Sequence, residues 1–379
     1  MKFMHLSDLH LGKRVNGFSM IEDQQYILNQ ILDIASDEKP DGVFIAGDIY
    51  DKSVPPAEAV QLFDDFLVGL SKEGISVFII CGNHDSAERV AFGGRLMTGS
   101  GIYISPIYDG TVEPVTLEDE YGEVNVYMLP FLKPAHVRRL YPESEIESYT
   151  DALKSVIEGL NLDEEQRNIL ITHQFVTGAQ RSESEEISVG GADNVDAAVF
   201  DRFDYVALGH IHRPQSVLRE TIRYSGTPLK YSFSEAAHQK SVTVAELAAK
   251  GQIDLREIPL VPLREMYEIR GAYDEVTLKS FYEGRGYQDG YMHITLTDEE
   301  DIPDAMGKLR AIYHNLMKLD YDNVRTRSNT EIEGAEDVQQ KPPVELFGEL
   351  YENQNNQPLN EVQREFLADL IKNIWEEKQ

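Results

Sequence analysis

The sequence predicts an α/β protein: a two-sheet sandwich of the α/β/β/α type, followed by a small α/β capping unit and C-terminal helices. Three observations predict this fold. Strand and helix patterns alternate in the first part of the chain, strands dominate after about residue 120 in hairpin-like succession, and five apolar runs each end at a metal-ligating type of side chain. Strands that alternate with helices, followed by a strand-rich half, indicate two packed sheets with helices outside.

The first domain is expected to span residues 1–265. Apolar residues at helical spacing predict helices over residues 21–35 and 57–70. Besides the five apolar runs, strands are expected at residues 124–129 and 241–244. These elements are enough to build two sheets and their outer helices.

A small α/β capping domain is expected over residues 266–330. Its pattern predicts strands at 266–270, 291–296 and 323–327, and helices at 275–282 and 303–319. Residues 331–342 are acidic and polar and lead into Lys341-Pro342-Pro343, which is typical of a linker. The capping domain is therefore expected to be separate from the C-terminal helices.

Two amphipathic helices are expected in residues 343–379. One apolar face is made of Val344, Phe347, Leu350 and Tyr351, and a longer stripe is made of Leu359, Val362, Phe366, Leu370, Ile374 and Trp375. Two short helices after a linker cannot bury such faces by themselves. They either pack on the body of the chain or, as the linker favours, dock onto another protein.

Composition limits the partners. The chain has 379 residues and a net charge of -31, with 66 acidic residues against 35 basic ones. Phosphate contacts need Lys and Arg, so this balance argues against a general nucleic-acid-binding surface. It is compatible with a surface that favours solubility. A polyanionic substrate would have to be held by bound metal, by a local basic patch or by a partner.

The sequence indicates a cytoplasmic protein without a membrane anchor. No charged leader precedes the first strand, and no apolar run approaches the roughly 20 residues that a membrane span needs. The single cysteine, Cys81, excludes an internal disulfide and fits a reducing compartment. Because Cys81 lies within an apolar run, it is expected to be a small buried hydrophobe and not a nucleophile.

Seven potential metal ligands follow the five apolar runs, which are residues 3–7, 42–47, 77–82, 168–172 and 205–209. Asp8 and His10 follow the first run, Asp48 the second, Asn83 the third, His173 the fourth, and His210 and His212 the fifth. Open α/β sheets bind ligands at the carboxyl ends of their strands. The seven side chains are therefore expected to meet at one edge and to form a two-metal hydrolytic site.

The donors divide into two sets of four if Asp48 is shared. One set is Asp8, His10, Asp48 and His212; the other is Asp48, Asn83, His173 and His210. Imidazole and oxygen donors without thiolate suit manganese, iron or zinc better than magnesium. Packing alone does not explain four histidines that each stand beside a strand end.

His84 follows Asn83 and is not needed as a ligand. A protonated His84 is expected to assist the leaving oxygen or to stabilise the transition state. The adjacent Asp85 is expected to accept a hydrogen bond from this imidazole and to select its tautomer. The alternative for Asp85 is that it caps the helix next in the chain.

These residues resemble the five motifs of the calcineurin-like metallophosphoesterases. The match rests on Asp8-Leu9-His10, Gly47-Asp48, Gly82-Asn83-His84-Asp85, His173 and Gly209-His210-Ile211-His212. Further segments are similar to the bacterial SbcD nuclease subunits: residues 205–215, Tyr224-Ser225-Gly226-Thr227-Pro228, Ser232-Phe233-Ser234-Glu235 and Lys240-Ser241-Val242. The resemblance covers the whole chain, more weakly after residue 260.

The resemblance implies a DNA-repair nuclease subunit that works with an SMC-like, coiled-coil ATPase of the SbcC type. It implies two divalent metal ions, with Mn2+ expected, and ATP-dependent double-strand exonuclease and single-strand or hairpin endonuclease activity. It also implies docking of the ATPase on the C-terminal helices and a homodimer within a heterotetramer. Lys13, Arg14 and Arg89 are candidate DNA contacts and, equally, ordinary surface charges.

Two rival functions stay open from the sequence. The same core serves small-molecule, cyclic-nucleotide or phosphoprotein phosphoesterases, which need neither a cap nor partner helices. A non-catalytic scaffold of this fold is the other alternative. Such scaffolds usually lose ligands, whereas all seven are present here.

Overall fold

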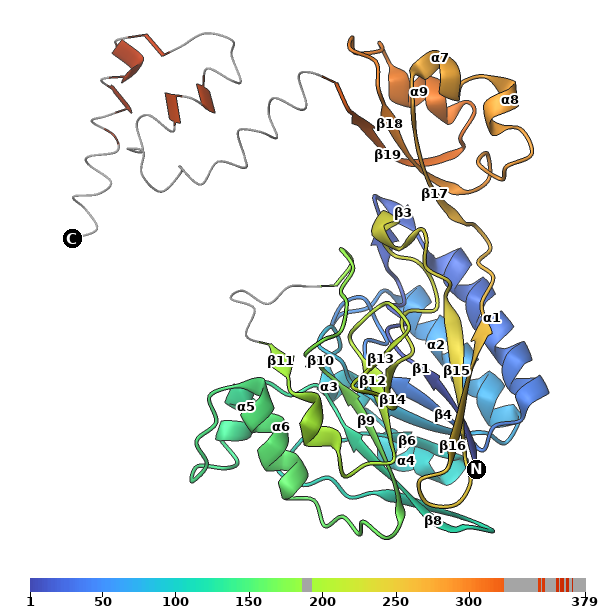
Figure 1. Ribbon diagram of the computed structural model, residues 1–379, viewed down its shortest axis with the longest axis vertical. Helices are drawn as coiled ribbons and strands as arrows, with labels where there is room; N and C mark the ends of the chain where they lie inside the picture. The colour runs from blue at the N-terminus through green and yellow to red at the C-terminus, as the bar shows by residue number, and fades with distance from the viewer. Residues whose placement is uncertain are drawn as a thin grey trace. The chain divides into compact units, whose positions relative to one another are not determined.

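The structure is a computed structural model that describes residues 1–185 and 193–323 and, in the C-terminal part, residues 347, 348, 350, 351, 359, 360, 362–364, 366, 367 and 370. It contains two compact units (Figure 1). The first comprises residues 1–270, 274–294 and 304–319, and the second residues 271–273, 295–303 and 320–379. The expected domain division at 265/266, 330/331 and 342/343 stays a prediction.

The first sheet has six strands in the order β16-β15-β1-β4-β5-β6. Its strands are β1 (Lys2–Leu6), β4 (Gly42–Ala46), β5 (Ser76–Ile80), β6 (Ile102–Ile104), β15 (Ser241–Leu247) and β16 (Ile253–Pro259). Strands β1, β4, β5 and β6 are parallel, and β15 and β16 add an antiparallel edge. The three apolar runs at the start of the chain are therefore neighbouring parallel strands whose carboxyl ends meet at one edge.

The second sheet also has six strands, in the order β13-β14-β12-β9-β8-β7. They are β7 (Val115–Asp119), β8 (Gly122–Leu129), β9 (Arg167–His173), β12 (Tyr205–Gly209), β13 (Gln215–Val217) and β14 (Arg219–Tyr224). The expectation of hairpin-like succession is wrong for the centre of this sheet, because β8, β9, β12 and β14 are parallel. Its edges, β7 and β13, are antiparallel. Parallel order is what brings His173 and the residues after Gly209 to the same edge.

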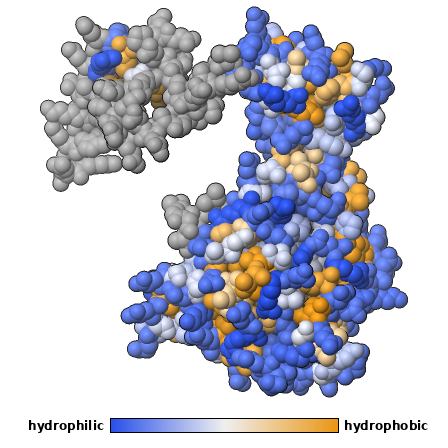
Figure 2. All heavy atoms as spheres, in the orientation of Figure 1, coloured by the Kyte–Doolittle hydropathy of each residue, from blue (hydrophilic) through white to orange (hydrophobic). Residues whose placement is uncertain are grey.

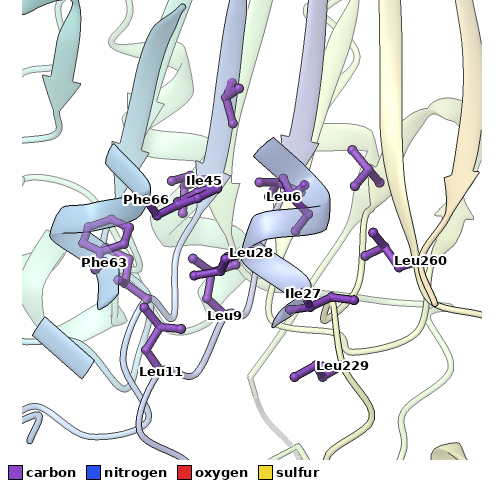
Figure 3. Close-up of a cluster of buried hydrophobic side chains, with 14 of the residues drawn as sticks. Leu6, Leu9, Leu11, Ile27, Leu28, Ile45, Phe63, Phe66, Leu229 and Leu260 are labelled. Atoms are coloured by element: carbon purple, nitrogen blue, oxygen red, sulfur yellow. The ribbon is translucent and has the colours of Figure 1, made fainter. Parts of the chain in front are cut away.

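The two sheets pack face to face, with helices outside, which confirms the α/β/β/α sandwich. Between the sheets lie aromatic side chains of the first sheet (Phe3, Phe44, Phe78) and aliphatic ones of the second (Val126, Ile169, Ile171). Helices α1 (Ile21–Glu38) and α2 (Ala57–Lys72) cover the first sheet, and α6 (Tyr149–Glu158) covers the second (Figure 1). Figure 3 shows α1 and α2 packing Ile27, Leu28, Phe63 and Phe66 against Leu6 and Ile45.

Shorter elements connect these layers. They are β2 (Arg14–Val15), β3 (Phe18–Ser19), α3 (Ala87–Val90), α4 (Gly94–Met97), α5 (Pro134–Arg138), β10 (Phe175–Val176), β11 (Asn194–Val195), and the 3-10 helices Thr98–Ser100, Ala197–Phe200 and Phe233–Glu235. His5 on β1 joins the two sheets, with Nδ1 3.0 Å from the Tyr205 hydroxyl and Nε2 3.1 Å from the Leu208 carbonyl. No helix among the described residues is both long and apolar enough to cross a membrane.

The segment after residue 265 forms a three-stranded sheet in the order β17-β18-β19. Its elements are β17 (Met266–Gly271), α7 (Tyr273–Val276), α8 (Lys279–Tyr282), β18 (Tyr291–Leu296), α9 (Ala305–Arg310) and β19 (Asn315–Tyr321). The strands expected at 266–270 and 291–296 are confirmed.

Two predictions for this segment are wrong. The helix expected at 303–319 spans only Ala305–Arg310, and residues 315–321 form the third strand of the sheet. The helix expected at 275–282 is two short helices, α7 and α8. Pairing in a three-stranded sheet overrides the helical preference of residues 315–319, as tertiary context commonly does. The strand expected at 323–327 stays a prediction, because residues 324–327 lie outside the described residues.

Part of the predicted C-terminal helices can be compared with the structure. Residues 347, 348, 350 and 351 are helical, and so are 362–364, 366, 367 and 370. Exposed apolar side chains among them are Phe347, Leu350, Val362, Phe366 and Leu370, while Leu367 is buried. Val344, Ile374, Trp375 and the linker 331–342 lie outside the described residues.

Candidate metal centre

All seven predicted ligands lie at the edge where the five strands end. Asp8 and His10 follow β1, Asp48 follows β4, Asn83 follows β5, His173 ends β9, and His210 and His212 follow β12. Six of them are buried, and Asn83 is half-buried. Donor atoms of Asp8, His10 and His212, and of Asp8, Asp48 and His173, lie within 4.8 Å of one another. The fold therefore brings together the side chains that the sequence singled out.

One half of the centre is built around His10. Its Nε2 atom lies 3.1 Å from Nε2 of His212 and 3.8 Å from Oδ2 of Asp48. Asp8 offers a carboxylate oxygen to the same group. This half contains the donors of the first expected set.

The other half is built around Asn83. Its Oδ1 atom lies 3.0 Å from Nε2 of His173 and 3.0 Å from Nδ1 of His210. Oδ2 of Asp48 lies 3.4 Å from Nε2 of His173. Asp48 thus faces both halves, which is the position that a shared ligand requires.

The spacing of these donors fits divalent cations. Two atoms that each lie about 2.1 Å from one ion are about 3.0 to 3.4 Å apart at octahedral or tetrahedral angles. The separations of 3.1 Å for His10–His212, 3.0 Å for Asn83–His173 and 3.4 Å for Asp48–His173 fall in that range. A donor set of imidazole nitrogens and carboxylate or amide oxygens suits Mn2+, Fe2+ or Zn2+.

The backbone turns sharply at the ligands. Four of them have left-handed φ angles: Asp8 (53°), His10 (45°), Asp48 (48°) and His210 (104°). Residues other than glycine rarely adopt this backbone conformation. Where they do, they are often at functional sites, where the surrounding fold stabilises the conformation. The turns direct four donors inward from the strand ends.

Close approach of the strand ends requires glycine beside the ligands. A Cβ on Gly209 would lie 1.8 Å from the Ala46 carbonyl oxygen, and one on Gly82 would lie 2.1 Å from Oδ1 of Asp48. Only a residue without a side chain lets the strand ends come this near. Gly209 thus lets strand ends of different sheets approach, so that His173 can face Asp48, while Gly82 leaves room for the Asp48 carboxylate within the first sheet.

Backbone groups orient several ligands. Nδ1 of His173 lies 2.8 Å from the Ala46 carbonyl, so Nδ1 carries the proton and Nε2 faces Asp48. Asp8 accepts the His210 amide at 3.0 Å, and Asp48 accepts the His84 amide at 2.9 Å. Hydrogen bonds of this kind fix the tautomer and direction of metal ligands.

The expected bond between His84 and Asp85 does not form, which corrects the predicted role of Asp85. Nδ1 of His84 lies 3.0 Å from the Asp51 carbonyl. The Asp85 carboxylate instead accepts the amides of Ile49 at 3.1 Å, Tyr50 at 3.0 Å and Gly82 at 3.0 Å. The helix-capping alternative is also wrong, because Ser86 is the N-cap of α3 and no described side chain caps that helix. Asp85 holds the backbone after Asp48.

His84 nevertheless lies at the centre. Its ring meets that of His10 edge to face with centroids 4.9 Å apart, and its Nε2 lies 3.9 Å from Oδ2 of Asp48. With Nδ1 donating to the Asp51 carbonyl, Nε2 is the atom that faces the ligands. His84 therefore has the position expected of an acid or hydrogen-bond donor, while its catalytic role stays a prediction.

The charges of the centre favour a bound cation. Burial raises the pKa of Asp8, whereas the pKa of Asp48 lies well below its usual range because His173 and His10 outweigh the effect of burial. Burial opposes ionisation of His173, but the Asp48 carboxylate raises its pKa to about 9. Burial and the neighbouring His173 lower the pKa of His210 to about 3. A proton on His173 thus occupies the place where a cation would neutralise Asp48.

The three candidate DNA contacts differ in their surroundings. Lys13 Nζ pairs with Asp51 at 2.7 Å and lies 5.5 Å from the centre of the Tyr231 ring. Arg14 is exposed and donates to the Gly17 carbonyl, and Arg89 is exposed and donates to the Ser53 carbonyl at 3.0 Å. Lys13 is thus already engaged with an acidic neighbour, and contact with DNA stays a prediction for all three.

Sequence reasoning missed a group of polar residues behind His212. Ser184 Oγ lies 2.5 Å from Nδ1 of His212, and Glu185 accepts the His212 amide at 2.7 Å. Glu235 and Lys240 form a buried ion pair beside them. Glu235 and Lys240 fall in motifs that support the resemblance, but nothing in their spacing indicates that they meet His212.

The chain is similar to known proteins over its full length. Residues 1–214 match the family described as calcineurin-like phosphoesterase, and residues 262–355 match the family described as Type 5 capsule protein repressor C-terminal domain. A protein of Staphylococcus epidermidis named as the SbcD subunit of the nuclease SbcCD is 34% identical over 378 residues, which cover 98% of each chain. A crystal structure of a dimetal phosphatase from Danio rerio has a TM-score of 0.42 and 10% identity, covering 69% of this chain and 98% of that one.

Proposed function

The chain belongs to the calcineurin-like phosphoesterases and, among them, to the SbcD nuclease subunits, and on this basis we propose that it hydrolyses DNA phosphodiester bonds in DNA repair. The observation that carries the proposal is the 34% identity to a nuclease subunit over 98% of both chains. The buried cluster of histidine and aspartate donors supports it, because a phosphodiesterase of this kind needs a site for divalent metal.

The proposed cofactor is a pair of Mn2+ ions. Asp8, His10, Asp48 and His212 would hold one ion, and Asp48, Asn83, His173 and His210 the other. Such ions supply Lewis acidity and a nucleophile at neutral pH. The donor separations near 3 Å and the lack of thiolate in both sets support this choice.

The chain's own residues would carry the remaining steps. The two ligand sets, joined by Asp48, would orient one phosphodiester in line for attack. His84, held by the Asp51 carbonyl through Nδ1, would present Nε2 to the leaving oxygen and donate a proton to it. Asp85 would keep the turn after Asp48 in place beside Gly82, through the amides of Ile49, Tyr50 and Gly82.

A chain of net charge -31 needs help to hold DNA. The face seen in Figure 2 is dominated by hydrophilic residues. Arg14 and Arg89, both exposed, are the better candidates for phosphate contacts, because Lys13 is paired with Asp51. The proposed partner would contribute most of the positive charge, since phosphate contacts dominate affinity for DNA.

The proposed partner is a coiled-coil ATPase of the SbcC type, docked on the C-terminal helices. The exposed apolar side chains there support this proposal, because isolated helices gain stability when such faces are buried: Phe347, Leu350, Val362, Phe366 and Leu370. A full-length chain should capture the ATPase, and a chain that ends at residue 342 should not. Capture by the shortened chain would contradict this assignment.

A homodimer within the complex is the second proposed contact. Phe92 and Leu96, in the segment of α3 and α4, are 84% and 88% exposed. Two large apolar side chains this exposed, four residues apart, support burial against a second copy. A cytoplasmic location also belongs to the proposal, and the free, buried Cys81 is consistent with it.

The proposed activity is tested by offering three substrates side by side with Mn2+: hairpin DNA, a cyclic dinucleotide and a phosphomonoester. A nuclease cuts the hairpin and leaves the two small molecules largely intact. Preference for either small molecule would assign the chain to the small-molecule phosphoesterases. Direct metal analysis of the same protein addresses the scaffold alternative, because a scaffold would take up no stoichiometric metal.

A further inference from the structure

A polar network, buried except at half-buried Ser184, lies on the side of His212 that faces away from the other ligands. Nδ1 of His212 meets Ser184 Oγ at 2.5 Å, and the Ser184 hydroxyl donates to Oε1 of Glu235. Lys240 Nζ completes the network with a bond to Oε2 of Glu235. Glu235 is fully buried and Lys240 is 3% exposed. The network runs from a charged pair to an imidazole that faces the metal centre.

The direction of each hydrogen bond in this network follows from the charge of the Glu235–Lys240 pair at one end. Glu235 is paired with the Lys240 ammonium, so its carboxylate only accepts hydrogen bonds. The single hydroxyl proton of Ser184 therefore points to Glu235, and Ser184 Oγ accepts from Nδ1 of His212. With the proton on Nδ1, the lone pair of Nε2 faces His10, 3.1 Å away. This is the tautomer that a metal ligand requires.

The network also holds the backbone of His212. Its amide donates to Oε1 of Glu185 at 2.7 Å, and its carbonyl accepts from Lys240 Nζ at 2.9 Å. His212 is thus hydrogen-bonded at its backbone amide, its backbone carbonyl and its imidazole ring. Burying an ion pair costs desolvation free energy, and stability alone is a weak reason for it. Positioning of a ligand gives the Glu235–Lys240 pair a specific role.

We propose that Ser184 and Glu235 are positioning residues that fix the tautomer and direction of His212, so that the short segment carrying Ser184 forms part of the metal centre. The inference rests on the proposed two-ion centre and deepens it. It means that the affinity for the ion held by His10 and His212 depends on the Glu235 carboxylate, which acts on His212 through the Ser184 hydroxyl. Partners of this kind typically change metal affinity by about 10- to 100-fold when they are removed.

The test compares full-length variants with Mn2+ alone, by titration calorimetry and by electron paramagnetic resonance. Ser184→Ala removes the hydroxyl, and Ser184→Thr keeps it. Ser234→Ala is the matched control, because Ser234 Oγ accepts the Glu183 amide at 3.1 Å and so holds the same segment without touching His212. Thermal unfolding of each variant reports whether it is folded.

The expected result has three parts. Ser184→Ala weakens one of the two ions by about 10- to 100-fold and converts the spectrum of a coupled Mn2+ pair to that of a single ion. Ser184→Thr and Ser234→Ala keep both ions. Wild-type affinity for both ions in Ser184→Ala, or equal loss in Ser184→Ala and Ser184→Thr, would overturn the positioning role alone. A wild-type chain that binds no Mn2+ would overturn the proposed centre and this role with it.

Discussion

The Nε2 atoms of His10 and His212 lie 3.1 Å apart although 202 residues separate them in the chain. His10 follows β1 of one sheet, and His212 follows β12 of the other. Two imidazole nitrogens that face each other this closely require a cation or a proton between them. The pairing therefore ties the packing of two sheets to the chemistry of one centre.

Asn83 and His84 are adjacent, but their substitution by alanine is expected to have different effects on metal binding and turnover. Asn83→Ala should lose one ion, because the Asn83 oxygen lies 3.0 Å from both His173 and His210. His84→Ala should keep both ions and lose about 10²- to 10⁴-fold in turnover. Elemental analysis by mass spectrometry and hydrolysis of hairpin DNA measure the two effects. Metal-depleted protein in the His84 variant would contradict this division.

Metal binding should release protons. The pKa of His173 is about 9 without an ion, so at about pH 7.5 the imidazole is protonated, and a cation must displace that proton. Affinity for Mn2+ should rise with pH up to about 9, by at most about tenfold per unit. Titration calorimetry in two buffers of different ionisation enthalpy counts the protons, and about one is expected. Identical heats of Mn2+ binding in both buffers would refute the prediction. The control is His136→Gln, a histidine outside the centre, which should release the same number of protons as the wild type.

His5 should make the fold sensitive to acid. Burial and then Arg223 lower its pKa to about 3 from an ordinary value of 6.5. Protonation therefore favours the unfolded chain, and stability is lost as the pH falls from about 6.5 towards 3. Between about pH 7.5 and 5 the wild type should lose about 2 kcal/mol more than His5→Gln. Urea unfolding with a chelator present measures the difference, and parallel pH profiles would show that His5 does not titrate as expected.

The proposed dimer predicts a change of mass in solution. Leu96→Asp places a charge on a side chain that is 88% exposed in the single chain, so the monomer should stay folded while association is lost. Light scattering coupled to size exclusion should show a dimer for the wild type and a monomer for the variant. Leu278→Asp, at a residue 56% exposed, is the control and should remain dimeric. A dimeric Leu96 variant would exclude this surface.

The close approach at Gly209 predicts a large loss of stability on adding one methyl group. In Gly209→Ala the new Cβ would lie 1.8 Å from the Ala46 oxygen, and the backbone on both sides would have to move. We expect a cost of about 3 kcal/mol and loss of metal binding, because overpacking shifts the strand ends. Gly99→Ala is the control, since a Cβ there would meet nothing within 4 Å. Denaturant unfolding compares the two, and equal stability would contradict the argument.

Much of the centre could be predicted from the sequence because each ligand directly follows an apolar strand. Parallel strands carry the residues at their carboxyl ends to a common edge, so Asp48 and Asn83 are neighbours at the edge of the first sheet, and His173 lies at the matching edge of the second. Helices α1 and α2 and the strands at 124–129 and 241–244 were predictable for a similar reason, since apolar periodicity is local. The third strand of the small sheet was not, because residues 315–319 become a strand only beside β18.

By itself, therefore, the sequence determined which metal donors exist and which strand carries each of them to the site. Tertiary structure alone decided what holds those donors in place. Asp85 supports the turn after Asp48 instead of orienting His84, and the Ser184 hydroxyl meets both His212 and Glu235, residues 28 and 51 positions away. Side chains so distant in the chain carry no periodic signal, because their hydrogen bonds depend on how two sheets and a connecting segment pack.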